Sequence, residues 1–156
     1  MTRKNAREIA VQLCFAAEAN HMDPTELLDI FFSREHYDTL GSEEELFHAF
    51  PDEAQMAYIR RLTQLVTEKR EALDEYIARY SHGWKPERIS RTALAVLRCA
   101  ICEILYVEDV PSAAAINEAI EVSKAYDDPD TVSFVNGVLG GFMRGEFPES
   151  EQAQQE

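Results

Sequence analysis

The sequence predicts an all-α fold, a single domain of about six to seven helices. Apolar residues recur at three- and four-residue spacing along most of its 156 residues, which is the pattern of amphipathic helices. No segment of useful length alternates apolar and polar residues as a β-strand does. Two Asp-Pro pairs, Asp23-Pro24 and Asp128-Pro129, combine a helix-capping residue with a proline suited to the first helical position.

In the first predicted helix, Ala6, Ile9 and Leu13 share one apolar arc, whereas Val11 and Phe15 fall on the polar arc. Later helices are bounded by capping residues and prolines, among them Asp52 and Ser112 as expected N-caps. The predicted helices span residues 5–19, 24–32, 53–80 (as one helix or two), 87–107, 112–126 and 130–143.

Residues 34–51 are predicted to form an acidic loop with at most one helical turn. Seven acids and no Lys or Arg lie between Arg34 and Arg60. By contrast, the helix expected over residues 87–107 is apolar on most of its circumference and should be the most buried one. It contains Cys99 and Cys102, for which we favour buried packing over a metal or redox site, because no histidine completes a metal-ligand spacing.

Length and composition favour one domain over residues 1–145, followed by an acidic tail, residues 146–156, that is expected to be disordered. Apolar residues make up 46% of the chain, enough for a core of this size. No apolar run approaches the ~20 residues of a membrane span, and the first residues lack the apolar core of a signal peptide. We therefore expect a cytoplasmic protein with no membrane contact.

The net charge of −14 comes from 15 basic and 29 acidic residues. On its own this charge argues against nucleic acid as a partner. The distribution is uneven, however, because the first 15 residues carry Arg3, Lys4 and Arg7 against Glu8 alone. A modest basic end is thus combined with an acidic body.

No catalytic or cofactor-binding motif is present. The sequence contains no phosphate-binding loop, no dinucleotide fingerprint, no nucleophile elbow and no zinc-protease motif. Paired catalytic carboxylates cannot be told from a solvated acidic face by sequence alone. We expect a protein that is not an enzyme and that holds no cofactor or metal.

Two aromatic residues stand among polar or small neighbours. Phe15 lies near cations on the outward arc of the first helix, and Phe134 lies beside glycine and polar residues at the start of the last. Cations for phosphates combined with aromatic faces for unstacked bases are typical of single-stranded RNA binding. The alternative is that both rings pack under a neighbouring helix, and the residues alone leave both interpretations open.

Four segments taken together resemble the NusB family of transcription antitermination factors. The last two, INEAIE with its following Lys and FVNGVL, are the most specific, and the resemblance extends over about residues 3–143. The segments are residues 5–13, Trp84 with residues 87–89 and 97–104, Pro111 with residues 115–126, and residues 134–139.

The resemblance implies an all-α fold of two helical bundles. It also implies an RNA-binding transcription antitermination factor, which binds the boxA element of nascent ribosomal RNA together with the ribosomal protein NusE. Such a complex joins the RNA polymerase antitermination complex and suppresses premature termination. The family includes monomers and dimers, so a homodimer remains open.

The resemblance implies RNA contacts at several positions of this chain. They are the basic residues at its start, the two aromatic residues Phe15 and Phe134, and an acidic residue four positions before Phe134. This coincidence favours the RNA interpretation of the two rings. A further family arginine maps to Arg98, for which a buried arginine satisfied by a carboxylate is an equal alternative. The implied RNA-binding residues are Arg3, Lys4, Arg7, Phe15, Arg98, Asp130 and Phe134.

Two other functions are compatible with the sequence. One is an acidic helical protein–protein adaptor without direct RNA contact, which the net charge suggests. The other is an RNA-binding domain related to that of ribosomal RNA cytosine methyltransferases, although such enzymes need a further cofactor-binding domain.

Overall fold

Helices form every regular element in the part of the chain that the computed structural model describes, residues 1–41, 44–82 and 88–148. The predicted all-α fold is confirmed, with eight α-helices and one 3-10 helix in that part where six to seven helices were expected. The chain divides into two compact units, Met1–Glu68 and Lys69–Glu156. Trp84 of the second family-like segment and residues 149–156 of the expected tail lie outside the described residues.

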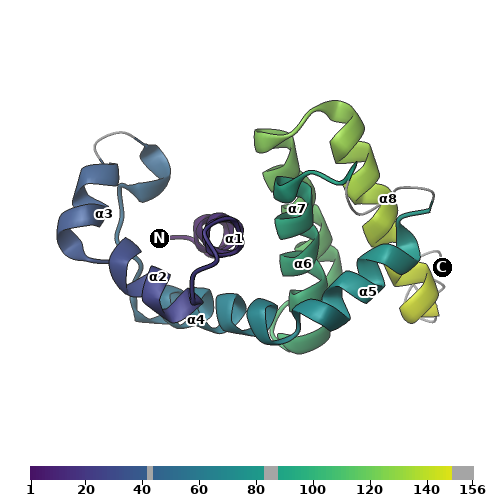
Figure 1. Cartoon of the computed structure of the whole chain (residues 1–156), viewed down its shortest axis with the longest axis horizontal. Helices are drawn as coiled ribbons and strands as arrows, with labels where there is room; N and C mark the ends of the chain where they lie inside the picture. Colours follow the sequence, from purple (N-terminus) through teal and green to yellow (C-terminus); the bar gives the residue numbers. More distant parts are fainter. Residues whose placement is uncertain (42–43, 83–87, 149–156) are drawn as a thin grey trace. The chain divides into compact units, whose positions relative to one another are not determined.

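The first unit is built on α1, which packs against α4 and α2. Figure 1 shows α1 along its axis, next to α4. The arc of α1 that the sequence predicted to be apolar, with Ala6, Ile9 and Leu13, is buried, as are Ile59 and Leu62 of α4. The elements of this unit are α1 (Arg3–Ala19), α2 (Pro24–Phe31), α3 (Arg34–Gly41), η1 (Glu45–Phe47) and α4 (Glu53–Glu68).

Side-chain caps begin these helices where the sequence placed them, with one shift. The backbone N–H of Thr25 donates to Asp23 Oδ1 at 2.8 Å, and that of Gln55 donates to Asp52 Oδ1 at 2.9 Å. The first helix, in contrast, begins two residues earlier than predicted, because the hydroxyl of Thr2 accepts a hydrogen bond from the N–H of Asn5.

The prediction of a loop over residues 34–51 is wrong for much of its length, since α3 and η1 lie within it. Tyr37 is buried there in a cluster of rings, and its hydroxyl donates to the carbonyl of Ala49 at 2.8 Å. Burial raises the pKa of Tyr37 to about 12. Edge and stacked ring contacts, rather than a long apolar periodicity, hold these short helices. The rings whose centroids lie within 6.0 Å of Tyr37 are Phe31, Phe32, Phe47 and Phe50.

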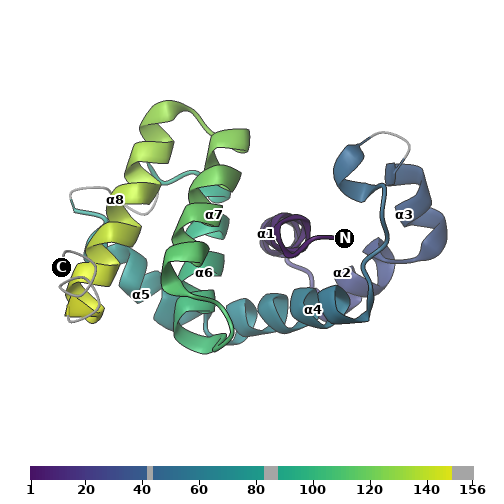
Figure 2. The ribbon, with the colours of Figure 1, turned by 180° about the vertical axis from the view of Figure 1, so that it is seen from behind.

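The second unit is built around α6, which packs against α5, α7 and α8. Figure 2 shows α6 and α7 side by side and α7 followed by α8 through a short connection. The stretch 53–80 proves to be two helices, with a break at Lys69. The elements of this unit are α5 (Arg70–Tyr80), α6 (Arg91–Tyr106), α7 (Ser112–Tyr126) and α8 (Pro129–Glu146).

One helix start and one cap residue differ from the prediction. The helix expected from residue 87 begins at Arg91, because Ser90 caps it by accepting a hydrogen bond from the N–H of Ala93 at 3.1 Å. Ser112 is the first residue of α7 and not its cap, since Pro111 occupies the cap position without a side-chain hydrogen bond.

The prediction that this central helix is the most buried one agrees with its long series of buried residues, from Ala93 to Glu103. Cys99 and Cys102 are 1% and 0% exposed and lie in that core as thiols, as the packing interpretation predicted. In the described residues, no helix is long and apolar enough to cross a membrane.

The last helix runs past residue 145, where the sequence suggested that the tail begins. The hydroxyl of Tyr80 donates to Glu146, and Arg79 forms an ion pair with the same carboxylate at 3.2 Å. The ring of Phe147 then lies 5.8 Å from that of Phe142. These contacts with α5 and within α8 order the end of the helix, although its local sequence is acidic and polar.

Candidate nucleic-acid interface

Two arginines of α1 lie against one aromatic ring of α4. The guanidinium of Arg3 lies 4.0 Å from the centroid of the Tyr58 ring, and its Nε donates to Gln55 Oε1 at 2.8 Å. Arg7, one turn further along α1, lies 5.8 Å from the same centroid and is only 7% exposed. Arg3 is therefore an exposed cation held against α4, while Arg7 lies deeper.

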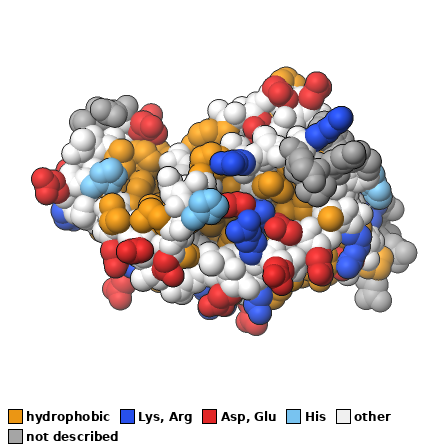
Figure 3. Space-filling model, viewed as in Figure 1, with side chains coloured by type: hydrophobic (Ala, Val, Ile, Leu, Met, Phe, Trp, Pro, Cys, Tyr) orange, Lys and Arg blue, Asp and Glu red, His pale blue; other side chains and the backbone are white. Residues whose placement is uncertain are grey.

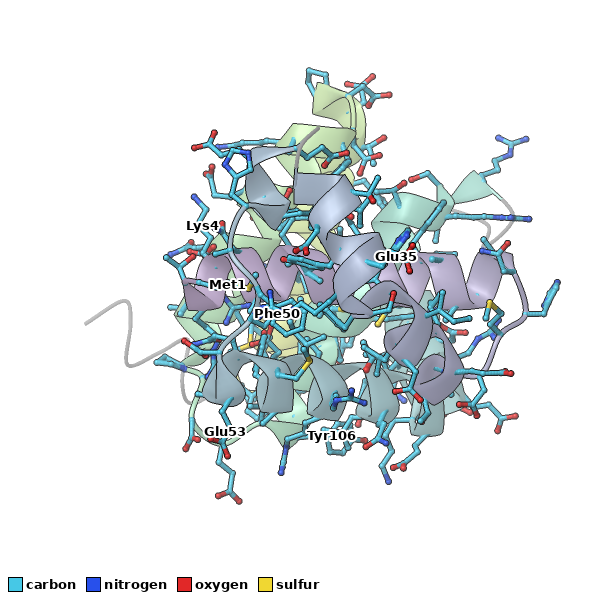
Figure 4. The ribbon with its side chains drawn as sticks, turned by 90° about the vertical axis from the view of Figure 1, so that its left-hand side faces the viewer. Met1, Lys4, Glu35, Phe50, Glu53 and Tyr106 are labelled. Carbon is cyan, nitrogen blue, oxygen red and sulfur yellow. The ribbon has the colours of Figure 1, made fainter. Side chains whose placement is uncertain are left out.

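Lys4 and Phe15 occupy one side of α1. Both are exposed, and Figure 4 shows Lys4 beside Met1, at the same end of the first unit as Glu53 of α4. At 100° per residue the two positions are about 20° apart around the helix, and at 1.5 Å per residue roughly 16 Å apart along it. A cation and a ring thus share a face three turns long.

The two apolar residues that the sequence placed on the polar arc behave differently. Val11 is buried, with 5% of its surface exposed, whereas Phe15 is 37% exposed. The ring of Phe15 is therefore not enclosed in the core. This exposure leaves a ring face available to a partner, as the RNA interpretation requires.

A group of acids marks the start of α8. The N–H of Thr131 donates to Asp128 Oδ1 at 2.7 Å, and this backbone hydrogen bond holds the pKa of Asp128 below its usual value. Burial is the main cause that raises the pKa of the neighbouring Asp127. Asp130 is exposed, and Phe134, half-buried, follows it by one turn on the same side of the helix.

Arg98 takes the alternative arrangement that the sequence left open. It is 5% exposed, and its Nε and Nη2 donate to Oδ1 and Oδ2 of Asp74 at 2.7 and 3.1 Å. A guanidinium that is buried and bound at two points is not presented to a nucleic acid strand. We therefore leave Arg98 outside the interface.

The candidate residues fall into two groups, one in each unit. Arg3, Lys4, Arg7 and Phe15 belong to α1, whereas Asp130 and Phe134 belong to α8. Sequence reasoning missed the α4 residues that hold Arg3. The only signal for Tyr58 was its place beside the apolar stripe of α4, which does not distinguish a supporting ring from an ordinary core ring.

Acidic side chains are spread over the visible surface in Figure 3 and do not gather into one patch. Within the described residues, no group of three or more His, Cys, Asp or Glu side chains is placed to hold a metal ion. The combination of cations and an exposed ring on α1 is thus the most specific polar feature that we find.

Comparisons with known proteins agree on one family. The model of the NusB family matches residues 4–144. The transcription antitermination protein NusB of Symbiobacterium thermophilum is 35% identical over 145 residues, which cover 93% of this chain and 91% of that protein.

Two solved structures share the fold. NusB of T. maritima has a TM-score of 0.75 at 26% identity and covers 92% of each chain. A structure described as antitermination factors NusB and NusE in complex with dsRNA has a TM-score of 0.73 at 20% identity, covering 92% of this chain and 96% of the other.

Proposed function

Because the chain belongs to the NusB family of transcription antitermination proteins, we propose that it binds the boxA element of nascent ribosomal RNA together with the ribosomal protein NusE. The resemblance inferred from the four sequence segments is confirmed by the family match. The expectation of a protein that is not an enzyme agrees with the character of this family, whose members are RNA-binding antitermination factors.

The partners proposed here have a precedent in one structural relative, which is described as NusB bound to NusE and dsRNA. For this chain we propose a single-stranded boxA segment, because unstacked bases are what an exposed ring can receive. The acidic body, at a net charge of −14, suits a basic ribosomal protein, since complementary potentials speed and orient association. The complex would act with RNA polymerase in the cytoplasm to suppress premature termination.

The observation that carries the proposal is the exposed pair of Lys4 and Phe15 on one side of α1, with Arg3 at the same helix start. In this arrangement Arg3 and Lys4 bind phosphates and so position the strand, while Phe15 stacks on a base. Phe134 of α8 provides a second ring, and the carboxylate of Asp130 accepts a hydrogen bond from an exocyclic amine of a base.

A fluorescence titration with boxA RNA, with and without NusE, tests this function. We expect Lys4→Ala to weaken RNA binding and to flatten its salt dependence by about 0.7 in the slope of log K against log salt, the value of one neutralised phosphate on a single strand. Lys124→Ala is the matched control, because Lys124 is an exposed cation whose ion pair with Glu121, at 3.3 Å, lies on its own helix.

The competing function is a protein–protein adaptor that does not touch RNA. It predicts that NusE is recovered equally well after nuclease treatment and that no residue of α1 crosslinks to RNA. That result would contradict direct RNA binding if, in addition, the Lys4→Ala variant and the unmodified chain had the same weak affinity for RNA. Sedimentation of the free chain would show whether it forms a homodimer, which the sequence left open.

A further inference from the structure

Arg3 is held by two side chains from a helix fifty residues further along the sequence. From this we infer that Gln55 and Tyr58 are positioning residues, which set the guanidinium of Arg3 in place to receive an RNA phosphate. The inference rests on the proposed function, because it assigns a role within the same RNA-binding surface. It concerns α1 and α4, which pack together within one unit.

The geometry leaves the phosphate-binding side of Arg3 unoccupied. Gln55 Oε1 takes the Nε–H at 2.8 Å, and the Tyr58 ring covers one face at 4.0 Å. A guanidinium has five N–H donors, and the remaining four lie on the two terminal nitrogens. No other described side chain takes them, so they form a planar fork suited to two phosphate oxygens.

The support on α4 is itself firmly placed. Tyr58 is 6% exposed and neighbours the buried Ile59. Gln55 lies in the first turn of the helix, which Asp52 caps through both its side chain and its carbonyl, the latter accepting from Met56 N–H at 2.8 Å. A cation on such a support loses less conformational freedom when it binds, because a free arginine side chain can adopt many rotamers that binding would otherwise have to restrict.

The electrostatics of the helix start favour an incoming anion. The first turn of α1 contains no acidic residue and carries Arg3 and Lys4, although cations are unfavourable at a helix N-terminus. Arg3 and Arg7 are also like charges four residues apart, a spacing that is mildly destabilising on a helix. The Tyr58 ring, which attracts both guanidinium groups, offsets part of this repulsion, and a phosphate bound by Arg3 would offset more of it.

A double-mutant cycle on the full chain with NusE and boxA RNA tests the inference. We expect Gln55→Ala and Tyr58→Leu each to weaken RNA binding about fivefold. This is the effect expected when the Arg3 side chain is no longer held in place and must be ordered on binding. In an Arg3→Ala background the same two changes should cause no further loss. Tyr58→Phe, which keeps the ring, should bind like the unmodified chain. Gln64→Ala, an exposed glutamine of the same helix, is the matched control.

The outcomes separate the two proposals. Equal losses with and without Arg3 would mean that Gln55 and Tyr58 act only on the fold, and would overturn the positioning role. Normal affinity in both variants, alongside weaker binding by Lys4→Ala, would likewise overturn it and leave the proposed function standing. An unmodified chain that fails to bind RNA with NusE would overturn both. Thermal melts of every variant identify any that lose the fold. If Tyr58→Leu does not fold, the test remains decisive through Gln55→Ala, because Gln55 is only half-buried.

Discussion

Arg98 of α6 and Asp74 of α5 form a two-point ion pair, with donor–acceptor distances of 2.7 and 3.1 Å. The arginine side chain is 6% exposed and the aspartate side chain 40%. The guanidinium therefore depends more on this pair than the carboxylate does, because water reaches the guanidinium less easily. The pair joins two helices of the second unit.

Removal of the carboxylate should be worse than removal of the cation. We expect Asp74→Ala to destabilise the protein by about 3 kcal/mol, since it leaves a buried guanidinium without its two-point partner. Arg98→Met should cost less, because the aliphatic side chain fills the space and Asp74 keeps water and Arg70, which lies 3.9 Å away. Urea unfolding measures both. A larger loss in Arg98→Met, or weaker RNA binding by its folded form, would contradict the structural role assigned to Arg98.

The buried phenol of Tyr37 makes stability depend on alkaline pH. Its pKa in the folded state is about 12 against an ordinary value of 10.0, so the folded state holds the proton more tightly. The resulting stabilisation is complete below pH 10.0 and is lost as the pH rises towards 12. Tyr37→Phe should lose less stability over that range.

At neutral pH the same variant should be about 1 kcal/mol less stable, because the carbonyl of Ala49 loses its donor. Urea unfolding from neutral pH to about pH 11 checks both effects. Identical alkaline losses in the two proteins would show that Tyr37 does not cause the pH dependence.

The two rings proposed to stack on RNA differ in burial, and their variants should differ accordingly. Phe15→Ala should weaken RNA binding by about 1–3 kcal/mol, the range for loss of a stacked base, with little change in thermal stability, because the ring is 37% exposed. Phe134→Ala should weaken binding similarly but also lower the melting temperature, since that ring is half-buried. Unchanged affinity in the double variant would refute stacking by either ring.

Two glycines of α8 provide a matched pair for helix stability. A Cβ at Gly137 would meet nothing within 4 Å, so Gly137→Ala should stabilise the protein by about 0.5–1 kcal/mol through helix propensity. A Cβ at Gly145 would collide with the Tyr80 hydroxyl, which donates a hydrogen bond to Glu146. Gly145→Ala should therefore bring no gain, or a loss. Thermal melts compare the two variants. Equal stabilisation by both changes would mean that the contact of Tyr80 with α8 does not contribute to stability.

Much of the fold could be predicted from the sequence because helix formation is largely local. Capping pairs such as Asp23-Pro24 and Asp128-Pro129 begin α2 and α8 through contacts with residues two or three positions away. The apolar character of the α6 sequence likewise predicted its central place. The short α3 and η1 were missed because ring contacts between separate short elements, rather than an apolar periodicity along one helix, hold Tyr37 in place.

The sequence by itself determined the helical class, the starts of α2, α4 and α7, the burial of α6 and the membership of the family. Only the tertiary structure decided that Val11 is buried while Phe15 is exposed, that Arg98 is committed to Asp74, and that Arg3 lies on Tyr58. The physical reason is that periodicity and caps depend on neighbours within a few residues. The exposure and partners of a side chain depend on which distant helix covers it, and no local pattern contains that information.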